Sequence, residues 1–211
     1  MSHETAPGSR AKPVVTLFES YGSGASVVGP RVAALLGVPF IGQRFSSDEI
    51  ERAEAERDAR GGLLPRLVRS LSRGAAGVEA NAGVIPTDEE HGSVLDNVRE
   101  LRKAVADGGV VVGRNATVIL ADHPNALHVK LDGPVEQRVA RAAAEAGIDL
   151  ALAAKRQVRE DRVRAEMSLR LHNWDPRQND RFDLVINTGS IALDKAAEII
   201  AANHRLLATE Q

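Results

Sequence analysis

A short glycine-rich segment, Gly22-Ser23-Gly24, is the first part of this sequence that could do chemistry. It follows an apolar, β-branched run at 13–19 that predicts a buried strand, and apolar residues at helical spacing begin just after it. Glycines in such a place let the backbone approach a phosphate group, and the following helix offers unpaired N–H groups and a positive dipole end. The same residues suit an ordinary tight turn, so the segment alone indicates either a phosphate site or a turn.

The glycine segment lacks the cation and the hydroxyl of a full Walker A motif. That motif places a Lys on the phosphates and a Ser or Thr hydroxyl on magnesium. When the two glycines are aligned, the lysine position is Ala25 and the hydroxyl position is Val27, while Ser26 stands one residue early. A dinucleotide fingerprint fails as well, because Val27 occupies the place of its third glycine.

Arginine supplies most of the positive charge, since only 5 of the 27 basic residues are lysines and none is in the glycine segment. Arg114 follows a second buried run, at 110–112, at the kind of strand end where α/β proteins bind ligands, although it could equally be a surface residue capping that strand. Five more arginines lie in a helical stretch at 150–171. They could stabilise charge on phosphate oxygens, or belong to a solvated helix with i,i+4 ion pairs.

Strands and helices alternate along the chain. We expect strands at 13–19, 110–112, 126–131 and 182–187, with a further short element at 38–41. We expect helices at 27–36, 46–60, 63–73, 94–106, 134–146, 150–171 and 191–207. This alternation predicts an α/β fold in which helices cover both faces of a parallel sheet. Pro30 is expected in the first turn of the first helix, and Gly37 at its C-cap.

Composition excludes several function classes. The 211 residues are 43% hydrophobic with a formal net charge of -2, which suits one globular domain at 13–207 and argues against a nucleic-acid partner. The lack of cysteine excludes thiolate catalysis and Cys-based zinc sites, and the six histidines have no metal-ligand spacing, so no metal site is expected. Residues 1–12 predict a disordered leader. No apolar run reaches the roughly 20 residues of a membrane helix, so we expect a cytoplasmic protein.

Four segments together resemble the cytidylate kinase-like family, a branch of the P-loop nucleoside monophosphate kinases. They are FESYGSG at 18–24 with Val28-Gly29, VVGRNA at 111–116, DRVR at 161–164, and Trp174-Asp175 followed by FDLVINT at 182–188. Their order and spacing make the resemblance specific over nearly the whole folded chain. It implies a P-loop NTPase-like fold with a five-stranded parallel sheet, a helical nucleotide-binding insert at about 42–92 and an Arg-rich lid at about 150–181.

The resemblance also implies an activity, which is ATP-dependent phosphorylation of CMP or a similar nucleotide, with Mg²⁺ held mainly by phosphates. It assigns the phosphates of ATP to a loop made of Gly22, Ser23, Gly24, Ala25, Ser26 and Val27. It assigns the acceptor nucleotide to Arg114, Asp161 and Arg164, and the catalytic lid cations to Arg156 and Arg159.

Two positions depart from the family pattern. Members usually have a second glycine where Ala25 stands, and commonly an Asp where Gly42 stands. These departures keep open an alternative, a nucleotide-binding or protein-interaction module on the same fold that has lost catalysis. In either case the expected partners are small-molecule nucleotides, with no membrane.

Overall fold

Five parallel strands form the centre of the fold, in the order β2-β3-β1-β4-β5. The computed structural model describes residues 12–43, 88–113 and 115–207. The strands are β1 (Val14–Glu19), β2 (Phe40–Ile41), β3 (Gly109–Val112), β4 (Ala126–Asp132) and β5 (Leu184–Asn187). In the central strand, Val14 lies beside Gly109 of β3 and Ala126 of β4. Because these strands are parallel, the carboxyl end of β1 lies between the carboxyl ends of β3 and β4. Open α/β sheets bind ligands at this edge.

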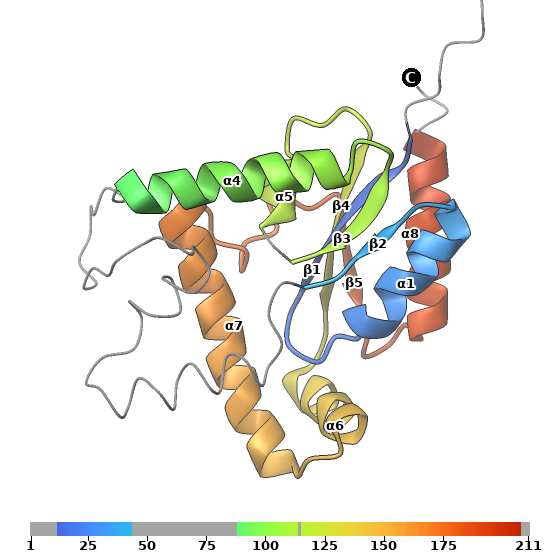
Figure 1. Ribbon diagram of the computed structural model, residues 1–211. Coiled ribbons are helices and arrows are strands. Elements are labelled where there is room, and N and C mark those ends of the chain that lie inside the picture. The colour runs from blue at the N-terminus through green and yellow to red at the C-terminus, as the bar shows by residue number, and fades with distance from the viewer. Residues whose placement is uncertain (1–11, 44–87, 114, 208–211) are drawn as a thin grey trace, which may run out of the picture.

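Helices cover both faces of this sheet (Figure 1). They are α1 (Ala25–Leu36), α4 (Asp88–Ala104), α5 (Ala116–Ile119), α6 (Val135–Ala146), α7 (Leu150–His172) and α8 (Leu193–Leu207). Successive residues of β1 point to opposite faces. Val15 and Leu17 join one apolar cluster with α1 and α8, whereas Val14 joins another with Leu101 of α4 and Ile119 of α5. The predicted α/β class and five-stranded parallel sheet are confirmed.

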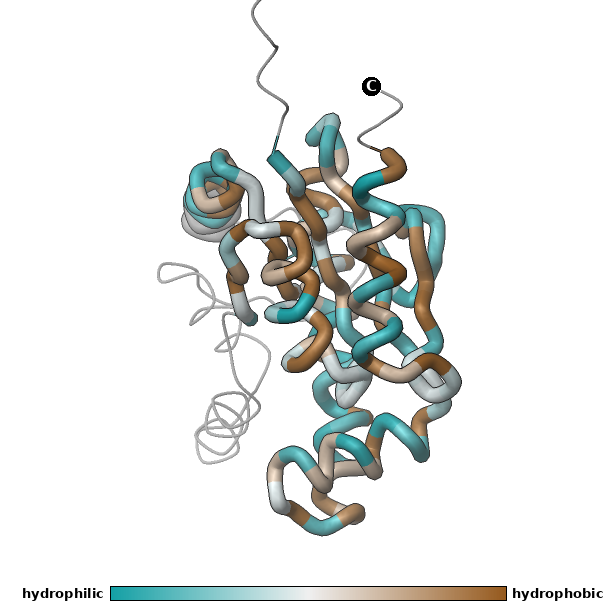
Figure 2. Tube along the Cα trace, turned by 90° about the vertical axis from the view of Figure 1, so that its right-hand side faces the viewer, coloured by the Kyte–Doolittle hydropathy of each residue, from teal (hydrophilic) through white to brown (hydrophobic). Residues whose placement is uncertain are grey.

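Apolar segments gather in the middle of the molecule, along the strands, whereas the helices alternate between polar and apolar stretches (Figure 2). This is the pattern expected of a sheet buried on both faces by amphipathic helices. Among the helices that the structure describes, none is long and apolar enough to cross a membrane.

The helices α6, α7 and α8 lie where the sequence predicts them, with ends shifted slightly. The short α5 was not predicted, because its four residues are too few to show a helical period. The predicted helices at 46–60 and 63–73 lie outside the described residues, as do most of the predicted insert at 42–92 and all of the predicted leader except Lys12. These expectations remain predictions.

The first helix begins earlier than its apolar spacing indicates. Gly24, in a left-handed conformation, precedes α1, so Pro30 lies inside the helix. The expectation of Pro30 in the first turn is therefore wrong, because the turn of helix at residues 25–28 precedes it. Lacking an N–H, Pro30 cannot donate to the carbonyl of Ser26 four residues earlier. At the other end Gly37 adopts the left-handed conformation at the C-cap, as predicted, and donates to the carbonyl of Ala33.

Candidate functional site

The glycine segment forms a tight loop between β1 and α1. Gly22 and Gly24 have φ of +74° and +90°, in the left-handed region that favours glycine. The Ser23 N–H and hydroxyl both donate to the carbonyl of Ser20, at 2.9 and 2.6 Å. A Cβ on Gly22 would collide with the backbone carbonyl of Arg138 in α6. Glycine is therefore needed here for its conformation and for the close approach of another helix.

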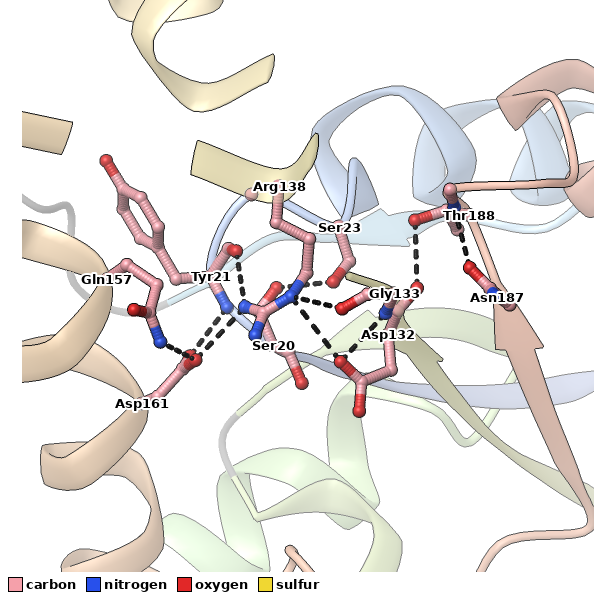
Figure 3. Close-up of polar contacts among 12 residues, drawn as sticks. Ser20, Tyr21, Ser23, Asp132, Gly133, Arg138, Gln157, Asp161, Asn187 and Thr188 are labelled. Atoms are coloured by element: carbon pink, nitrogen blue, oxygen red, sulfur yellow. Dashed lines mark hydrogen bonds and ion pairs between the residues drawn. The ribbon is translucent and has the colours of Figure 1, made fainter. Parts of the chain in front are cut away.

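Two arginines of α6 donate hydrogen bonds to backbone carbonyls of this loop. Arg138, buried, donates from Nη1 to the carbonyl of Tyr21 at 2.8 Å and from Nε to that of Gly133 at 2.9 Å (Figure 3). Arg141 donates from Nη1 to the carbonyl of Gly22 at 2.8 Å, and from Nη2 to that of Thr188 at 2.6 Å. Sequence reasoning missed both residues, since nothing local separates them from ordinary surface arginines of an amphipathic helix.

Asp161 ties the Arg-rich helix α7 to the same loop. Its Oδ1 accepts the Tyr21 N–H at 2.7 Å, and its Oδ2 accepts from Arg138 Nη1 at 3.0 Å and from Gln157 Nε2 at 2.8 Å (Figure 3). Both carboxylate oxygens are therefore engaged by the protein. The structure places Asp161 directly against the loop, where it fixes the loop to α7. Its predicted contact with an acceptor nucleotide remains a prediction.

The loop N–H groups that open α1 already hold the carboxyl group of Glu19, at the end of β1. Its Oε1 accepts from Gly24 N at 3.1 Å and from Ala25 N at 3.0 Å, and its Oε2 accepts from Gln43 Nε2 at 3.0 Å. Burial raises the pKa of Glu19 above its ordinary value. The positive charge of Arg164 and the two N–H groups oppose that rise. Sequence reasoning did not identify Glu19, because its role depends on how the chain turns back at the loop.

Arg164 of α7 lies close enough to this carboxylate for its positive charge to lower the pKa of Glu19. Its Nη2 donates to Oε2 of Glu160 at 2.8 Å, and the Glu160 side chain is fully buried. The Nη1 atom lies 3.9 Å from Oδ1 of Asp161, and among the residues the structure describes it has no hydrogen-bond acceptor. The guanidinium therefore has donor capacity left beside the glycine loop.

The other predicted site residues are placed as follows. Ala25 is buried, whereas Ser26 and Val27 are exposed at the start of α1, where Ser26 Oγ donates to Glu145 at 2.6 Å. Arg156 is buried and Arg159 half-buried, in the part of α7 that precedes Asp161. Arg114 lies outside the described residues.

The turn that follows Arg114 packs against α7. Asn115 has a φ of 56°, and its Oδ1 accepts from the hydroxyl of Ser168 at 2.6 Å. The chain just past the end of β3 therefore lies beside the helix that carries Asp161 and Arg164. Around the described parts of the chain, no group of three or more metal-ligating side chains occurs.

Trp174, which directly follows α7, packs inside the protein. It is buried, and its ring lies edge-on to that of Phe18, with centroids 6.2 Å apart, and 5.5 Å from that of Phe182. Lys130 secures the segment that follows, donating to the carbonyls of Pro176 and Arg177 at 3.1 and 3.3 Å. These contacts favour a packing role for Trp174 over stacking on a base.

The sheet order and the glycine loop between the central strand and α1 define a kinase-like P-loop fold. The chain belongs to the cytidylate kinase-like family, which its sequence matches over residues 14–190. The crystal structure of an uncharacterized protein from Eubacterium ventriosum ATCC 27560 has the same fold, with a TM-score of 0.65 at 16% identity over 92% of this chain and 99% of that chain.

Two further likenesses are weaker or partial. A gluconokinase from Sinorhizobium meliloti 1021 gives a TM-score of 0.49 at 17% identity, over 95% of this chain and 96% of that one. A uronate isomerase from Corynebacterium glutamicum is 37% identical over 108 residues, which are 51% of this chain. The match spans only 21% of the length of that curated relative.

Proposed function

We propose that this protein is an ATP-dependent nucleoside monophosphate kinase that acts on CMP or a similar nucleotide, in the cytoplasm. The observation that carries the proposal is the carboxylate of Glu19 on the N–H groups of Gly24 and Ala25. It indicates that the start of α1 binds oxyanions without a lysine. Membership of the cytidylate kinase-like family supports the same conclusion.

The residues present fit such a reaction. The backbone of 22–27 would hold the phosphates of ATP, which supplies the phosphoryl group. Arg138 and Arg141 would maintain the loop conformation through their hydrogen bonds to its carbonyls. Val27 offers no ligand, so Mg²⁺ would be held mainly by phosphates and water. Arginine side chains must then neutralise the negative charge on the phosphate oxygens, which the P-loop lysine usually does.

The acceptor would bind between the end of β3 and α7. Arg114 and Arg164 would bind its phosphate, because a planar guanidinium pairs with two phosphate oxygens at once. Arg164 is supported by its free donor capacity and by the buried carboxylate of Glu160, which fixes its orientation. We keep Asp161 as an acceptor ligand and Arg156 and Arg159 as the lid cations in this proposal.

Coupled-enzyme turnover with ATP and CMP, dCMP or UMP tests the proposal. We expect turnover with one of them and its loss in Arg164→Lys, which keeps the charge beside Glu160 but loses the planar fork. Arg162→Lys is the matched control. Arg162 lies two residues away on α7, exposed, with only a 3.9 Å ion pair to Glu166. Absence of turnover with all three acceptors, where a known kinase is active, would contradict the proposal.

A second candidate is a nucleotide-binding or protein-interaction module without catalysis. Ala25 and Val27 favour it, since each removes a group that phosphoryl transfer normally uses. Titration calorimetry separates the two candidates. Saturable ATP binding without turnover supports the nucleotide-binding module, and absence of binding indicates an interaction role.

A further inference from the structure

Glu19 is held from both of its oxygens at the place where the proposed function puts a phosphate group. Oε1 bridges two successive N–H groups at the start of α1, and Oε2 is fixed by Gln43, which follows β2. Two other N–H groups of the loop are also used within the chain. Ser23 N donates to the carbonyl of Ser20, and Val27 N donates to that of Gly24.

We propose that Glu19 is a resident anion that closes the phosphate loop, and that a phosphate group of a nucleotide binds by displacing it from Gly24 and Ala25. This inference rests on the proposed function, because it takes the loop as the phosphate site. The two anions compete because one pair of N–H groups cannot donate fully to both. If Glu19 stayed in place, its charge would repel the phosphate across a short distance.

Several groups set how firmly the carboxylate is held. Arg164 on α7 and the two N–H groups favour its ionised form, whereas burial and the negative charge of Glu145 on α6 disfavour it. Burial is the largest of these effects, and it raises the pKa of the carboxyl. The displacement is inferred from the geometry, because Glu19 Oε1 occupies the two N–H groups that a phosphate group would need. Once Glu19 leaves, the guanidinium of Arg164 is available to the incoming anion.

Binding of ATP by titration calorimetry tests this displacement in the full chain. In Glu19→Gln the charge is lost and the shape is kept, and in Glu19→Ala the contact is lost altogether. We expect both to bind ATP about tenfold or more tightly than the wild type, since a hydrogen bond to a charged group is worth about one decade in affinity. Glu145→Gln is the matched control. It removes a nearby carboxylate that contacts Ser26 Oγ without touching the loop N–H groups, so we expect less than about a threefold change.

A second readout does not depend on nucleotide. The amide chemical shifts of Gly24 and Ala25 should follow the protonation of Glu19 as the pH is lowered, in the wild type and in Glu145→Gln, with a midpoint above that of an ordinary glutamate. They should not do so in Glu19→Gln. Flat shifts in the wild type would overturn the contact itself.

The possible outcomes separate the inference from the function on which it rests. Equal ATP affinity of the wild type and both Glu19 variants would overturn the displacement and leave the proposed function standing. Equal gains in Glu145→Gln and Glu19→Gln would also overturn it, because general charge repulsion would then account for the effect. If no variant binds ATP, both the proposed function and the displacement are contradicted.

Discussion

Replacement of Asp161 by Ala tests whether α7 is anchored to the glycine loop as the structure shows. The variant loses the hydrogen bonds from Tyr21 N at 2.7 Å and Arg138 Nη1 at 3.0 Å. Each such bond to a charged group is worth about 1.5–3 kcal/mol. Since the Asp161 side chain is 27% exposed, we take the lower end of that range for each bond. The free energy of unfolding should therefore fall by about 3 kcal/mol, or about two decades in the folding equilibrium.

Urea denaturation followed by circular dichroism measures this change, with Glu166→Gln as the control on the same helix. Glu166 is exposed and 3.9 Å from its partner, so its loss should cost less than about 0.5 kcal/mol. Asp161→Asn should fall between the two, because the amide oxygen can still accept from Tyr21 N. Because the anchor shapes the loop, we also expect weaker ATP binding by Asp161→Ala. Unchanged stability and ATP affinity, with only acceptor binding reduced, would refute the anchoring role.

Two further predictions concern the glycine loop and two half-buried histidines, His128 and His172. Gly22→Ala should cost about 3 kcal/mol or more, since it adds a collision with the Arg138 carbonyl to a strained φ, whereas Gly37→Ala, at a similar φ with open space around it, should cost about 1 kcal/mol. Equal losses of unfolding free energy in the two variants, measured by urea denaturation, would contradict the close approach of the Arg138 carbonyl to Gly22. Burial lowers the pKa of His128 and His172, so the folded protein binds fewer protons than the unfolded chain. Their contribution to stability should be complete above about pH 6.5 and lost as the pH falls from there toward their folded pKa values. The free energy of unfolding, measured by denaturation across that range, should depend more steeply on pH in the wild type than in the double variant His128→Asn, His172→Asn. Identical pH profiles would argue against burial of these histidines as the cause of the pH dependence.

The sequence alone determined the elements and much of their order. The run at 13–19 is apolar and β-branched, the run at 126–131 alternates apolar and polar residues, and the helices at 134–146 and 150–171 have a helical pattern that is a local property of the chain. The glycine loop was also predictable, because Gly22 and Gly24 directly follow a strand. A short helix such as α5 carries too little periodicity to be recognised in this way, whereas the short element expected at 38–41 coincides with β2.

The tertiary structure alone decided what the loop touches. Arg138 and Arg141 are unremarkable in an amphipathic helix, and they reach the loop carbonyls only because parallel strand β4 carries α6 alongside β1. Likewise, Asp161 is 140 residues from the backbone N–H that it accepts. Glu19 is the last residue of a strand that the sequence predicts. Its place on the N–H groups of Gly24 and Ala25 follows from two positive φ angles that fold the chain back on itself. Sequence periodicity indicates on which face of a helix or strand a side chain lies. It does not indicate which distant segments come into contact, because that depends on how the helices pack on the sheet.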